Sequence, residues 1–544
     1  MTNSTLTLAR VSFVLPDGNT LFSELNEQFD YRHTGLVGRN GVGKSLLAKM
    51  LAGLVRPTSG HCHGSGKVRY LAQHLSPLNY HNVAMLAGVD ARLAALQRIE
   101  AGSVDSADFD LVGDGWDLRQ RLQIQLEFAG LGYLTPDSTV NRLSGGEAMR
   151  VALTGAMLSD ADFLILDEPT NHLDGASRLA LIQQLQRWPR GLLTISHDRT
   201  LLQQMTRIVE LSSLGLRSYG GNYAFYQQMK AQETAAASQK LERLKTERKR
   251  EEQALRDQRE RFEKRQLRSD RQSKVANQAK ILLGRQKGRS EASAGKLTKQ
   301  QAEMRAQLSQ QVQEAAKKIE TSAHIVMHSM PSCTALSQNV AALNEAILPF
   351  VPAPFSRITL AINGGQRIGV VGPNGCGKST LLKTLAGLLP LASGHCEVRV
   401  KAAYLDQQLS ILHPEETVLE QLKAVNSQAG EAQLRMQLAQ LGLDATKGSL
   451  PCGKLSGGEQ LKAALATVIY ADPPATFLLL DEPSNHLDFP SLHALESLLN
   501  QYRGTLMVVS HDEVFLSQIG LTHRLVAGDK GWELLAHQDP AWPE

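Results

Sequence analysis

The feature that most constrains the fold is a set of four short motifs that occurs twice in the same order, the copies lying 312 to 334 residues apart. The pairs are Gly38-Arg-Asn-Gly-Val-Gly-Lys-Ser45 with Gly372-Pro-Asn-Gly-Cys-Gly-Lys-Ser379, Leu143-Ser-Gly-Gly-Glu147 with Leu455-Ser-Gly-Gly-Glu459, Leu166-Asp-Glu-Pro-Thr-Asn-His-Leu-Asp174 with Leu480-Asp-Glu-Pro-Ser-Asn-His-Leu-Asp488, and Ser196-His-Asp198 with Ser510-His-Asp512. Such a repeat indicates a tandem duplication. A chain of 544 residues is also too long for one core, so we expect two copies of one domain.

The composition excludes several classes of protein. Hydrophobic residues make up 42% and charged residues 21%, which is ordinary for a globular chain. No run approaches the roughly 18 apolar residues that cross a bilayer, and the first residues lack the pattern of a secretory signal. Five cysteines are too few to form a disulfide framework in so long a chain. We therefore expect a cytoplasmic protein without membrane insertion.

The spacing of the motifs predicts the domain boundaries. Lys44 to Gln73 and Lys378 to Gln407 both span 29 residues, whereas Gln73 to Ser144 spans 71 and Gln407 to Ser456 only 49. The first copy thus carries about 22 extra residues, which we place within 75–126 as a small arm. The predicted domains are 1–228, 229–325 and 326–544.

The segment between the copies is strongly basic. Residues 240–289 hold 18 Lys and Arg against 8 Asp and Glu, a net charge of +10 in a chain whose total is +4. Glycine and proline are absent from 222–283, return around 284–295, and are followed by a second helical pattern over 296–322. We predict an antiparallel helical hairpin whose positive charge exceeds what solubility requires. A solvated linker helix without a partner is the alternative.

Each glycine-rich motif follows an apolar strand-like run, 34–37 or 368–371, and opens a helical pattern. That context is what a phosphate-binding loop requires, because backbone N–H groups at a helix start close around phosphates. The lysine contributes a point charge and the serine offers a hydroxyl to Mg²⁺. The predicted nucleotide-binding residues are Gly38, Asn40, Gly41, Gly43, Lys44, Ser45 and Leu46, with Gly372, Asn374, Gly375, Gly377, Lys378, Ser379 and Thr380.

Two apolar strands, 163–166 and 477–480, end in Asp-Glu, a pair that suits a metal-phosphate site better than packing. We assign Asp167 and Asp481 to the magnesium shell, and Glu168 and Glu482 to polarising the attacking water. Two histidines that repeat at the same offset from these glutamates are expected to reach the γ-phosphate, and two glutamines to report occupancy of the metal site. They are His197 and His511, and Gln73 and Gln407. The predicted metal ligands are Ser45, Gln73 and Asp167, and Ser379, Gln407 and Asp481.

In order and content, this motif set resembles the ATP-binding-cassette superfamily. The resemblance implies an α/β fold with two P-loop nucleotide-binding domains in tandem, joined here by an α-helical hairpin. It also implies that each Ser-Gly-Gly caps the phosphates held by the opposite cassette, within one monomer. Site one would then join Lys44 and Glu168 to Ser456, Gly457 and Gly458. Site two would join Lys378 and Glu482 to Ser144, Gly145 and Gly146.

Within the superfamily, Asn171-His-Leu-Asp174, Asn485-His-Leu-Asp488, Tyr219-Gly-Gly-Asn-Tyr223 and the charged linker resemble the ABC-F family. That resemblance implies an ATP hydrolase using Mg²⁺ that binds ribosomes, with the hairpin reaching toward tRNA. Some members act as translation factors and some protect against antibiotics. The alternatives are the energy module of a membrane exporter and an ATPase of DNA repair, so DNA also remains a possible partner of the hairpin.

The copies differ at several site positions. Ala148 stands where the second copy has Gln460, and Leu46 where it has Thr380. Leu15 occupies a region where an aromatic ring usually stacks on adenine, a role we give to Phe350 in the second copy. Cys376, at a helix start and near a lysine, is predicted to be a reactive thiolate.

Overall fold

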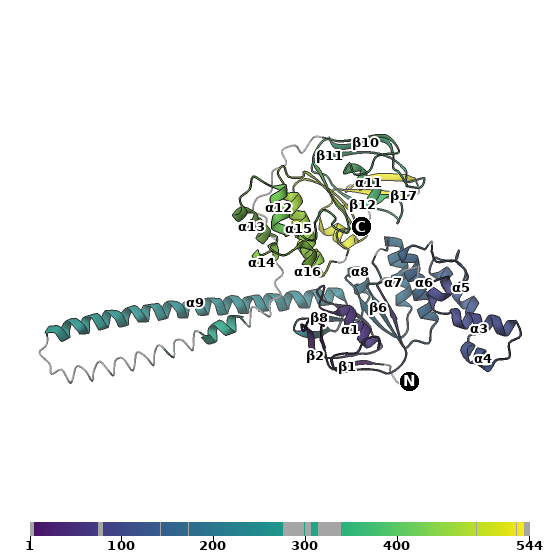
Figure 1. The fold of residues 1–544 in the computed structure, drawn as a ribbon, viewed down its shortest axis with the longest axis horizontal. Helices are drawn as coiled ribbons and strands as arrows, with labels where there is room; N and C mark the ends of the chain where they lie inside the picture. Colours follow the sequence, from purple (N-terminus) through teal and green to yellow (C-terminus); the bar gives the residue numbers. More distant parts are fainter. Residues whose placement is uncertain are drawn as a thin grey trace. The chain divides into compact units, whose positions relative to one another are not determined.

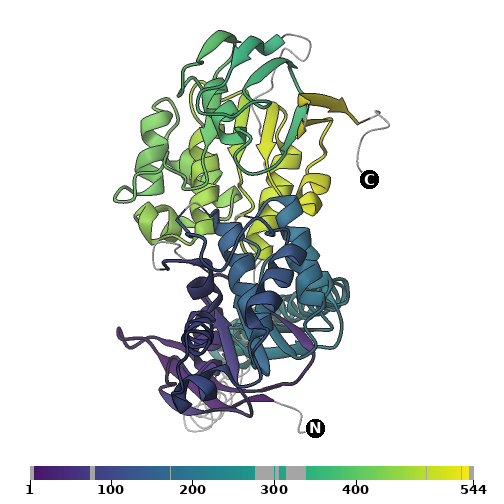
Figure 2. The ribbon, with the colours of Figure 1, turned by 90° about the vertical axis from the view of Figure 1, so that its right-hand side faces the viewer.

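The computed structural model describes residues 5–73, 80–141, 143–171, 173–275, 299, 306–313, 339–485, 487–528 and 530–537. The chain forms two compact units, one made of residues 1–223 with 322–544 and the other of residues 224–321. The first unit contains both cassettes, each with its own sheets and helices (Figures 1 and 2).

Each cassette is built on a six-stranded sheet with the same strand order. In the first copy the order is β5-β6-β7-β3-β8-β9, and in the second it is β14-β15-β16-β12-β17-β18. All neighbours are parallel except the last pair. The first set is β3 (His33–Val37), β5 (Val68–Leu71), β6 (Phe163–Asp167), β7 (Gly191–Ile195), β8 (Arg207–Ser212) and β9 (Gly215–Tyr219). The second is β12 (Arg367–Val371), β14 (Ala402–Leu405), β15 (Phe477–Asp481), β16 (Thr505–Val509), β17 (His523–Gly528) and β18 (Gly531–Ala536).

The position of the central strands in each large sheet explains why their sequences are continuously apolar. Every residue of β6, β7, β15 and β16 is buried, as expected for parallel strands covered on both faces. A three-stranded antiparallel sheet packs against each large sheet through a shared apolar cluster. These sheets are β2-β1-β4 and β11-β10-β13, made of β1 (Leu6–Val14), β2 (Thr20–Phe29) and β4 (Ser59–Gly64), and of β10 (Asn339–Ile347), β11 (Arg357–Asn363) and β13 (Ser393–Val398).

The helices also correspond between the copies. The first copy has α1 (Lys44–Leu51), α2 (Val83–Ala87), α5 (Leu118–Phe128), α6 (Gly145–Leu158), α7 (Gly175–Gln186) and α8 (Arg199–Gln203). The second has α11 (Lys378–Leu385), α12 (Val418–Val425), α13 (Glu431–Gln440), α14 (Ala445–Gly448), a short 3₁₀ turn (Cys452–Lys454), α15 (Gly457–Ile469), α16 (Phe489–Gln501) and α17 (Glu513–Gln518).

Two helices set the first copy apart. Between α2 and α5 it inserts α3 (Asp90–Glu100) and α4 (Ser106–Val112), which an ion pair between Arg98 and Asp108 joins. In the second copy only residues 426–430 separate α12 from α13. The extra length of the first copy therefore forms a helical pair inside the segment 75–126.

The second unit is dominated by α9 (Tyr223–Val275), a helix of 53 residues (Figure 1). Its described side chains beyond the first turns are mostly charged and exposed, as the absence of glycine and proline and the basic composition predicted. The predicted hairpin tip at 284–295 lies outside the described residues. So does most of the second limb, of which the described stretch 306–313 is helical.

Candidate functional site

The two phosphate loops have the same backbone geometry. β3 leads into α1 through Gly43, and β12 leads into α11 through Gly377, with φ values of 95° and 96°. A methyl group on Gly43 would lie 2.5 Å from the Cδ2 atom of Leu21. Glycine is therefore required by both conformation and space, and the loop keeps its N–H groups at the helix start.

The side chain of each loop lysine hydrogen-bonds to carbonyl oxygens of its own loop. The Nζ atom of Lys44 donates to the carbonyl oxygens of Gly38 at 2.7 Å and Arg39 at 3.0 Å, and that of Lys378 donates to Gly372 and Pro373, both at 2.9 Å. Both lysines are only 7% exposed, and burial lowers the pKa of Lys44. Each ammonium group thus lies in the loop where a phosphate would replace carbonyl oxygens as its partner.

The aspartates at the strand ends carry oxygen partners that suit magnesium. Asp167 accepts hydrogen bonds from the Ser45 hydroxyl and the Tyr70 hydroxyl, each at 3.0 Å. Asp481 accepts one from the Tyr404 hydroxyl at 3.0 Å. A carboxylate beside a hydroxyl is the donor set that Mg²⁺ uses together with phosphates and water. The tyrosines were not predicted from the sequence, although each lies three residues before a predicted glutamine.

The backbone is strained at the two glutamates that follow these aspartates. Glu168 and Glu482 have φ values of 48° and 50°, which residues with a side chain rarely adopt and which often mark functional sites. Burial raises the pKa of Glu168 and raises that of Glu482 to about 7. A carboxyl group with such a pKa is suited to accept a proton near neutral pH.

Each glutamate faces its predicted histidine. His197 Nε2 lies 3.8 Å from a carboxylate oxygen of Glu168, and His511 Nε2 lies 3.4 Å from one of Glu482. Burial lowers the pKa of His197 to about 3 and that of His511 to about 4, so both rings are neutral. Both ring nitrogens of His197 and one oxygen of Glu482 are buried without a hydrogen-bond partner. Buried polar atoms are rarely left so, which points to a polar ligand at this place.

Two cavities gather these groups. The first, about 500 Å³, is lined by Asn40, Gly41, Gly43, Lys44, Ser45, Leu46, Gln73, Glu168 and His197 among others. The second, about 440 Å³, is lined by Phe350, Asn374, Gly375, Gly377, Lys378, Ser379, Thr380, Gln407, Asp481, Glu482 and His511 among others. The structure thus brings most of the predicted residues of each site around one space.

Each phosphate loop also contacts a residue of the opposite cassette. The backbone N–H of Asn40 donates to a carboxylate oxygen of Asp488 at 3.0 Å, and that of Asn374 donates to Asp174 at 3.1 Å. The same aspartates cap α7 and α16 through Ser177 and Ser491. Each phosphate loop is thus in reciprocal contact with the helix start that follows the other copy's Asp-Glu-Pro motif.

The serines of the Ser-Gly-Gly motifs cap helices. Ser144 and Ser456 begin α6 and α15, each with a reciprocal hydrogen bond to the glutamate three residues later. Among the described residues that line the two cavities, neither serine nor its glycines is present. Their contact with a nucleotide of the opposite cassette therefore stays a prediction.

Comparison with known proteins identifies the family. A family model described as "ABC transporter" matches residues 29–171 and 355–485. ABC transporter F family member 5 of Arabidopsis thaliana is 32% identical over 521 residues, covering 89% of this chain and 69% of that protein. The energy-dependent translational throttle protein EttA of Mycobacterium tuberculosis is 30% identical over 510 residues, covering 89% and 84%. The chain belongs to the ABC-F family of ATP-binding-cassette ATPases.

Solved structures agree with the fold of this ABC-F chain. The archaeal ribosome recycling factor aABCE1, solved with a ribosomal stalk protein, superposes with a TM-score of 0.59 at 19% identity over 97% of this chain and 90% of that one. A structure titled RNase-L Inhibitor gives a TM-score of 0.57. The predicted α/β fold with tandem cassettes is confirmed. In the part of the chain that the structure describes, no helix has the length and apolar character that crossing a bilayer requires.

Reasoning from sequence missed Arg178 of the ABC-F chain. Arg178 lies in the first turn of α7 and so belongs to the first cassette, yet it lines the second cavity together with Glu482 and His511. Its Nε atom lies 3.1 Å from a carboxylate oxygen of Asp198, the neighbour of His197. Counting from the capping aspartates, the second copy has Leu492 at this position. Only the pairing of the cassettes brings this cation to the second site, so the local sequence gives no signal for it.

Two other site positions have opposite outcomes. Phe350 is 95% exposed at the rim of the second cavity, where a base can stack on it, while Leu15 is not among the described residues that line the first.

The prediction that Cys376 is a reactive thiolate was wrong. Its side chain is 1% exposed, and burial raises the pKa of its thiol despite the charge of Lys378. Desolvation outweighs the helix start and the lysine.

Proposed function

We propose that this ABC-F chain binds two ATP molecules between its cassettes, hydrolyses them, and works on the ribosome as a translation or antibiotic-resistance factor. The observation that carries the ATPase proposal is the reciprocal contact of each phosphate loop with the opposite cassette, through Asp488 and Asp174. Residues of both copies thus meet at each phosphate loop, which favours closure and hydrolysis as one coupled event.

In the proposed reaction, each residue set has one task. The loop N–H groups and Lys44 or Lys378 hold the phosphates of the substrate. Glu168 or Glu482 accepts a proton from the attacking water, and the neutral ring of His197 or His511 hydrogen-bonds to the γ-phosphate. Water adds to the γ-phosphorus, the bond to ADP breaks, and the proton held by the glutamate leaves with phosphate.

Magnesium fits this arrangement. Asp167 with Ser45, and Asp481 with Ser379, would hold it, Gln73 and Gln407 lying in the same cavities. When bound, the ion neutralises charge on the phosphate oxygens.

The ribosome proposal rests on two supports. Among the relatives, EttA is named as a translational throttle, and the ABC-F chain covers 84% of it. The segment 240–289 carries a net charge of +10, beyond what solubility requires, and its described part, up to Val275, belongs to a helix of 53 residues. RNA binding by such a helix is largely electrostatic and weakens steeply with salt.

Co-sedimentation tests the proposal. The hydrolysis-blocked variant, Glu168→Gln with Glu482→Gln, should bind ATP and sediment with ribosomes in an ATP-dependent manner. Membranes and branched DNA are tested in parallel, because these are the partners of an exporter module and of a DNA-repair ATPase. Sedimentation with either of them and not with ribosomes would overturn the ribosome role.

A charge reversal tests the linker. Three basic residues at the predicted hairpin tip are changed to Glu: Arg285, Lys287 and Arg289. Ribosome binding should be lost while ATPase without ribosomes changes little. The matched control reverses three exposed cations of the cassettes: Arg56, Arg357 and Lys383. Equal loss in both variants would mean that total charge and not the linker controls binding.

A further inference from the structure

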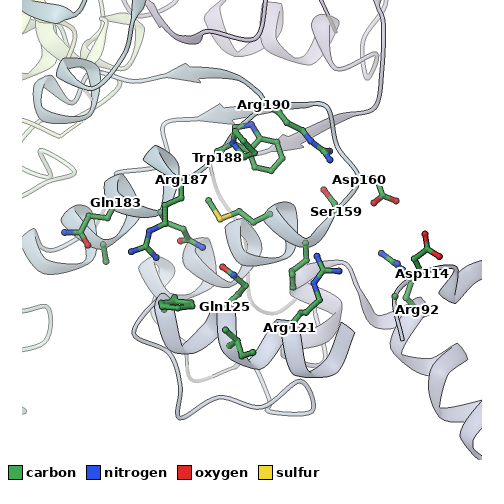
Figure 3. Close-up of a pocket in the computed structure, with 18 residues that line it drawn as sticks. Arg92, Asp114, Arg121, Gln125, Ser159, Asp160, Gln183, Arg187, Trp188 and Arg190 are labelled. Carbon is green, nitrogen blue, oxygen red and sulfur yellow. The ribbon is translucent and has the colours of Figure 1, made fainter. Parts of the chain in front are cut away.

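A third cavity lies away from both nucleotide sites, on the helical side of the first cassette. It measures about 620 Å³ and lies between α5, the end of α6 and the end of α7. Four arginines surround it: Arg92 of α3, Arg121 of α5, and Arg187 and Arg190 of the segment between α7 and β7 (Figure 3). Two carboxylates, Asp114 and Asp160, also line it, so the described lining is cationic by two charges.

The second copy shows that the shared fold does not need these arginines. The two copies of the α5 helix end at equivalent glycines, Gly130 and Gly442, with φ values of 70° and 78° and the same hydrogen-bond pattern. Counting back from them, Gln433 takes the place of Arg121.

The same comparison holds for the other cations. Counting from the capping aspartates of α7 and α16, Gln501 takes the place of Arg187 and Gly504 that of Arg190. Arg92 belongs to α3, which the described second copy lacks. Among the described residues, these four arginines are therefore particular to the first copy.

An aromatic face accompanies the charge. Phe128, at the end of α5, is 67% exposed, and the guanidinium of Arg187 lies 5.4 Å from the centre of its ring. The second copy has Gln440 at this position. Large exposed aromatic rings next to arginine are typical of surfaces that bind a partner, because they offer stacking at little cost in side-chain entropy.

The amide groups add hydrogen-bonding capacity. Gln125, Gln183 and Gln184 line the cavity, and the buried Oε1 atom of Gln184 has no hydrogen-bond partner. The second copy has a buried leucine, Leu498, where the first has Gln184. A polar side chain with an unpaired oxygen replaces an apolar one, which is unfavourable for packing alone.

The contacts of these arginines leave their positive charge available to an anionic ligand. Arg190 donates to the carbonyl oxygen of Ala161 at 2.6 Å and Arg92 to that of Val112 at 3.2 Å, bonds that leave the positive charge uncompensated. Arg121 lies 3.8 Å from Asp117, with half of its side chain exposed. Such exposed pairs contribute little and exchange readily for another anion.

We propose that this cavity binds an unpaired RNA segment, with phosphates on Arg121 and Arg187 and a base stacked on Phe128. Arginine and glutamine side chains beside an aromatic ring suit phosphates and the edges of splayed bases. An amphipathic peptide would need a continuous apolar strip, which the glutamines interrupt. The source of the RNA rests on the proposed ribosome function, and the cavity gives the chain a second RNA contact besides its linker.

Photo-crosslinking of the full chain tests this without ribosomes. The probe is a single-stranded RNA of about eight nucleotides with 4-thiouridine, within the usual footprint of such sites. Cross-linked peptides should include residues 118–128 or 183–190 in addition to the linker. A duplex of the same sequence should compete for the linker and not for the cavity.

Variants then locate the contact. Exchanging Arg121 and Arg187 for Gln, the residues of the second copy, should reduce cross-linking at the cavity at least about tenfold and leave linker cross-links unchanged, because two phosphate partners are lost. The matched control, Arg435→Gln with Arg503→Gln, removes two exposed arginines from α13 and from the segment after α16, the second copy's counterparts of α5 and of the segment after α7. It should cross-link like the parent.

Several results would overturn the proposal. Cross-links confined to the linker, equal loss in the control pair, or capture of an acidic peptide at the cavity without RNA cross-links would each do so. The map of the unaltered chain decides the matter even where a variant folds poorly. A chain that cross-links here but fails to sediment with ribosomes would remove the proposed function and leave this inference standing.

Discussion

Arg178 allows the two nucleotide sites to be told apart by one substitution. Because it belongs to the first cassette but lines the second cavity, Arg178→Leu should impair the second site and spare the first. Leucine is the residue that the second copy holds at the equivalent position, Leu492, so the helix start accepts it.

The size of the effect follows from what the arginine supplies. The described residues bring two cations to the second cavity, Lys378 and Arg178, and only the lysine would remain. Loss of one preorganised electrostatic group typically slows the chemical step about 10²–10³-fold. The charge of Arg178 also lowers the pKa of Glu482, so its removal leaves less of the glutamate ionised at neutral pH.

The assay measures single-turnover phosphate release with one site silenced. In a Glu168→Gln background only the second site reacts, and Arg178→Leu should slow it about 10²-fold. In a Glu482→Gln background only the first site reacts, and the same substitution should change the rate much less, because Arg178 is not among the described residues that line the first cavity. Arg178→Lys, which keeps the charge, should recover part of the rate. Equal slowing in both backgrounds, or none in either, would refute the assignment to the second site.

Four further predictions concern the nucleotide sites and the contact between the cassettes. Glu168→Gln with Glu482→Gln should lower steady-state ATPase about 10²–10⁴-fold while ATP still binds, and near-normal turnover would exclude these residues as bases. Since the glutamates must be ionised to accept a proton and burial raises the pKa of Glu482 to about 7, kcat/KM should fall as the pH drops below that value, and a flat profile from about pH 6 to 9 would contradict this. The buried ion pair of Arg199 and Glu496, 2.9 Å apart, joins the cassettes. Glu496→Ile should reduce the free energy of urea unfolding by about 3–5 kcal/mol, and adding Arg199→Met should recover most of it. Cys376 should react slowly with maleimide whether or not ATP is present, and peptide mapping that finds rapid labelling without ATP would contradict its burial.

The sequence predicted the parts of the site that depend on neighbouring residues. A glycine-rich motif between an apolar strand and a helix has one plausible geometry, and Lys44 and Lys378 lie as expected. Strands β6 and β15 end at the predicted aspartates because a carboxylate cannot continue a fully buried strand. The extra helices of the first copy also lie within the range that the spacing indicated.

Properties that depend on tertiary packing were not accessible in this way. The environment of Cys376 is electropositive along the chain, but its burial, which decides the pKa, comes from surrounding elements. Arg178 and the arginine-lined cavity require knowing which helices lie next to each other. A charged residue on a helix surface is usually solvated, so the sequence alone favours the interpretation that these arginines are exposed to solvent and have no binding role.

The copies of this ABC-F chain have kept their phosphate loops and diverged in what surrounds them. Arg178 faces the second cavity, and its equivalent, Leu492, brings no charge to the first. Phe350 offers a ring to the second site, whereas the described lining of the first contains no Phe, Tyr or Trp, and the extra helices belong to the first cassette. Both cavities contain a glutamate and a histidine, so the proposed reaction has its proton acceptor at each site, and the sites differ in the groups around it. Under the proposed function, two unequal sites in one chain are suited to act in order, so that one hydrolysis event commits the factor and the other releases it.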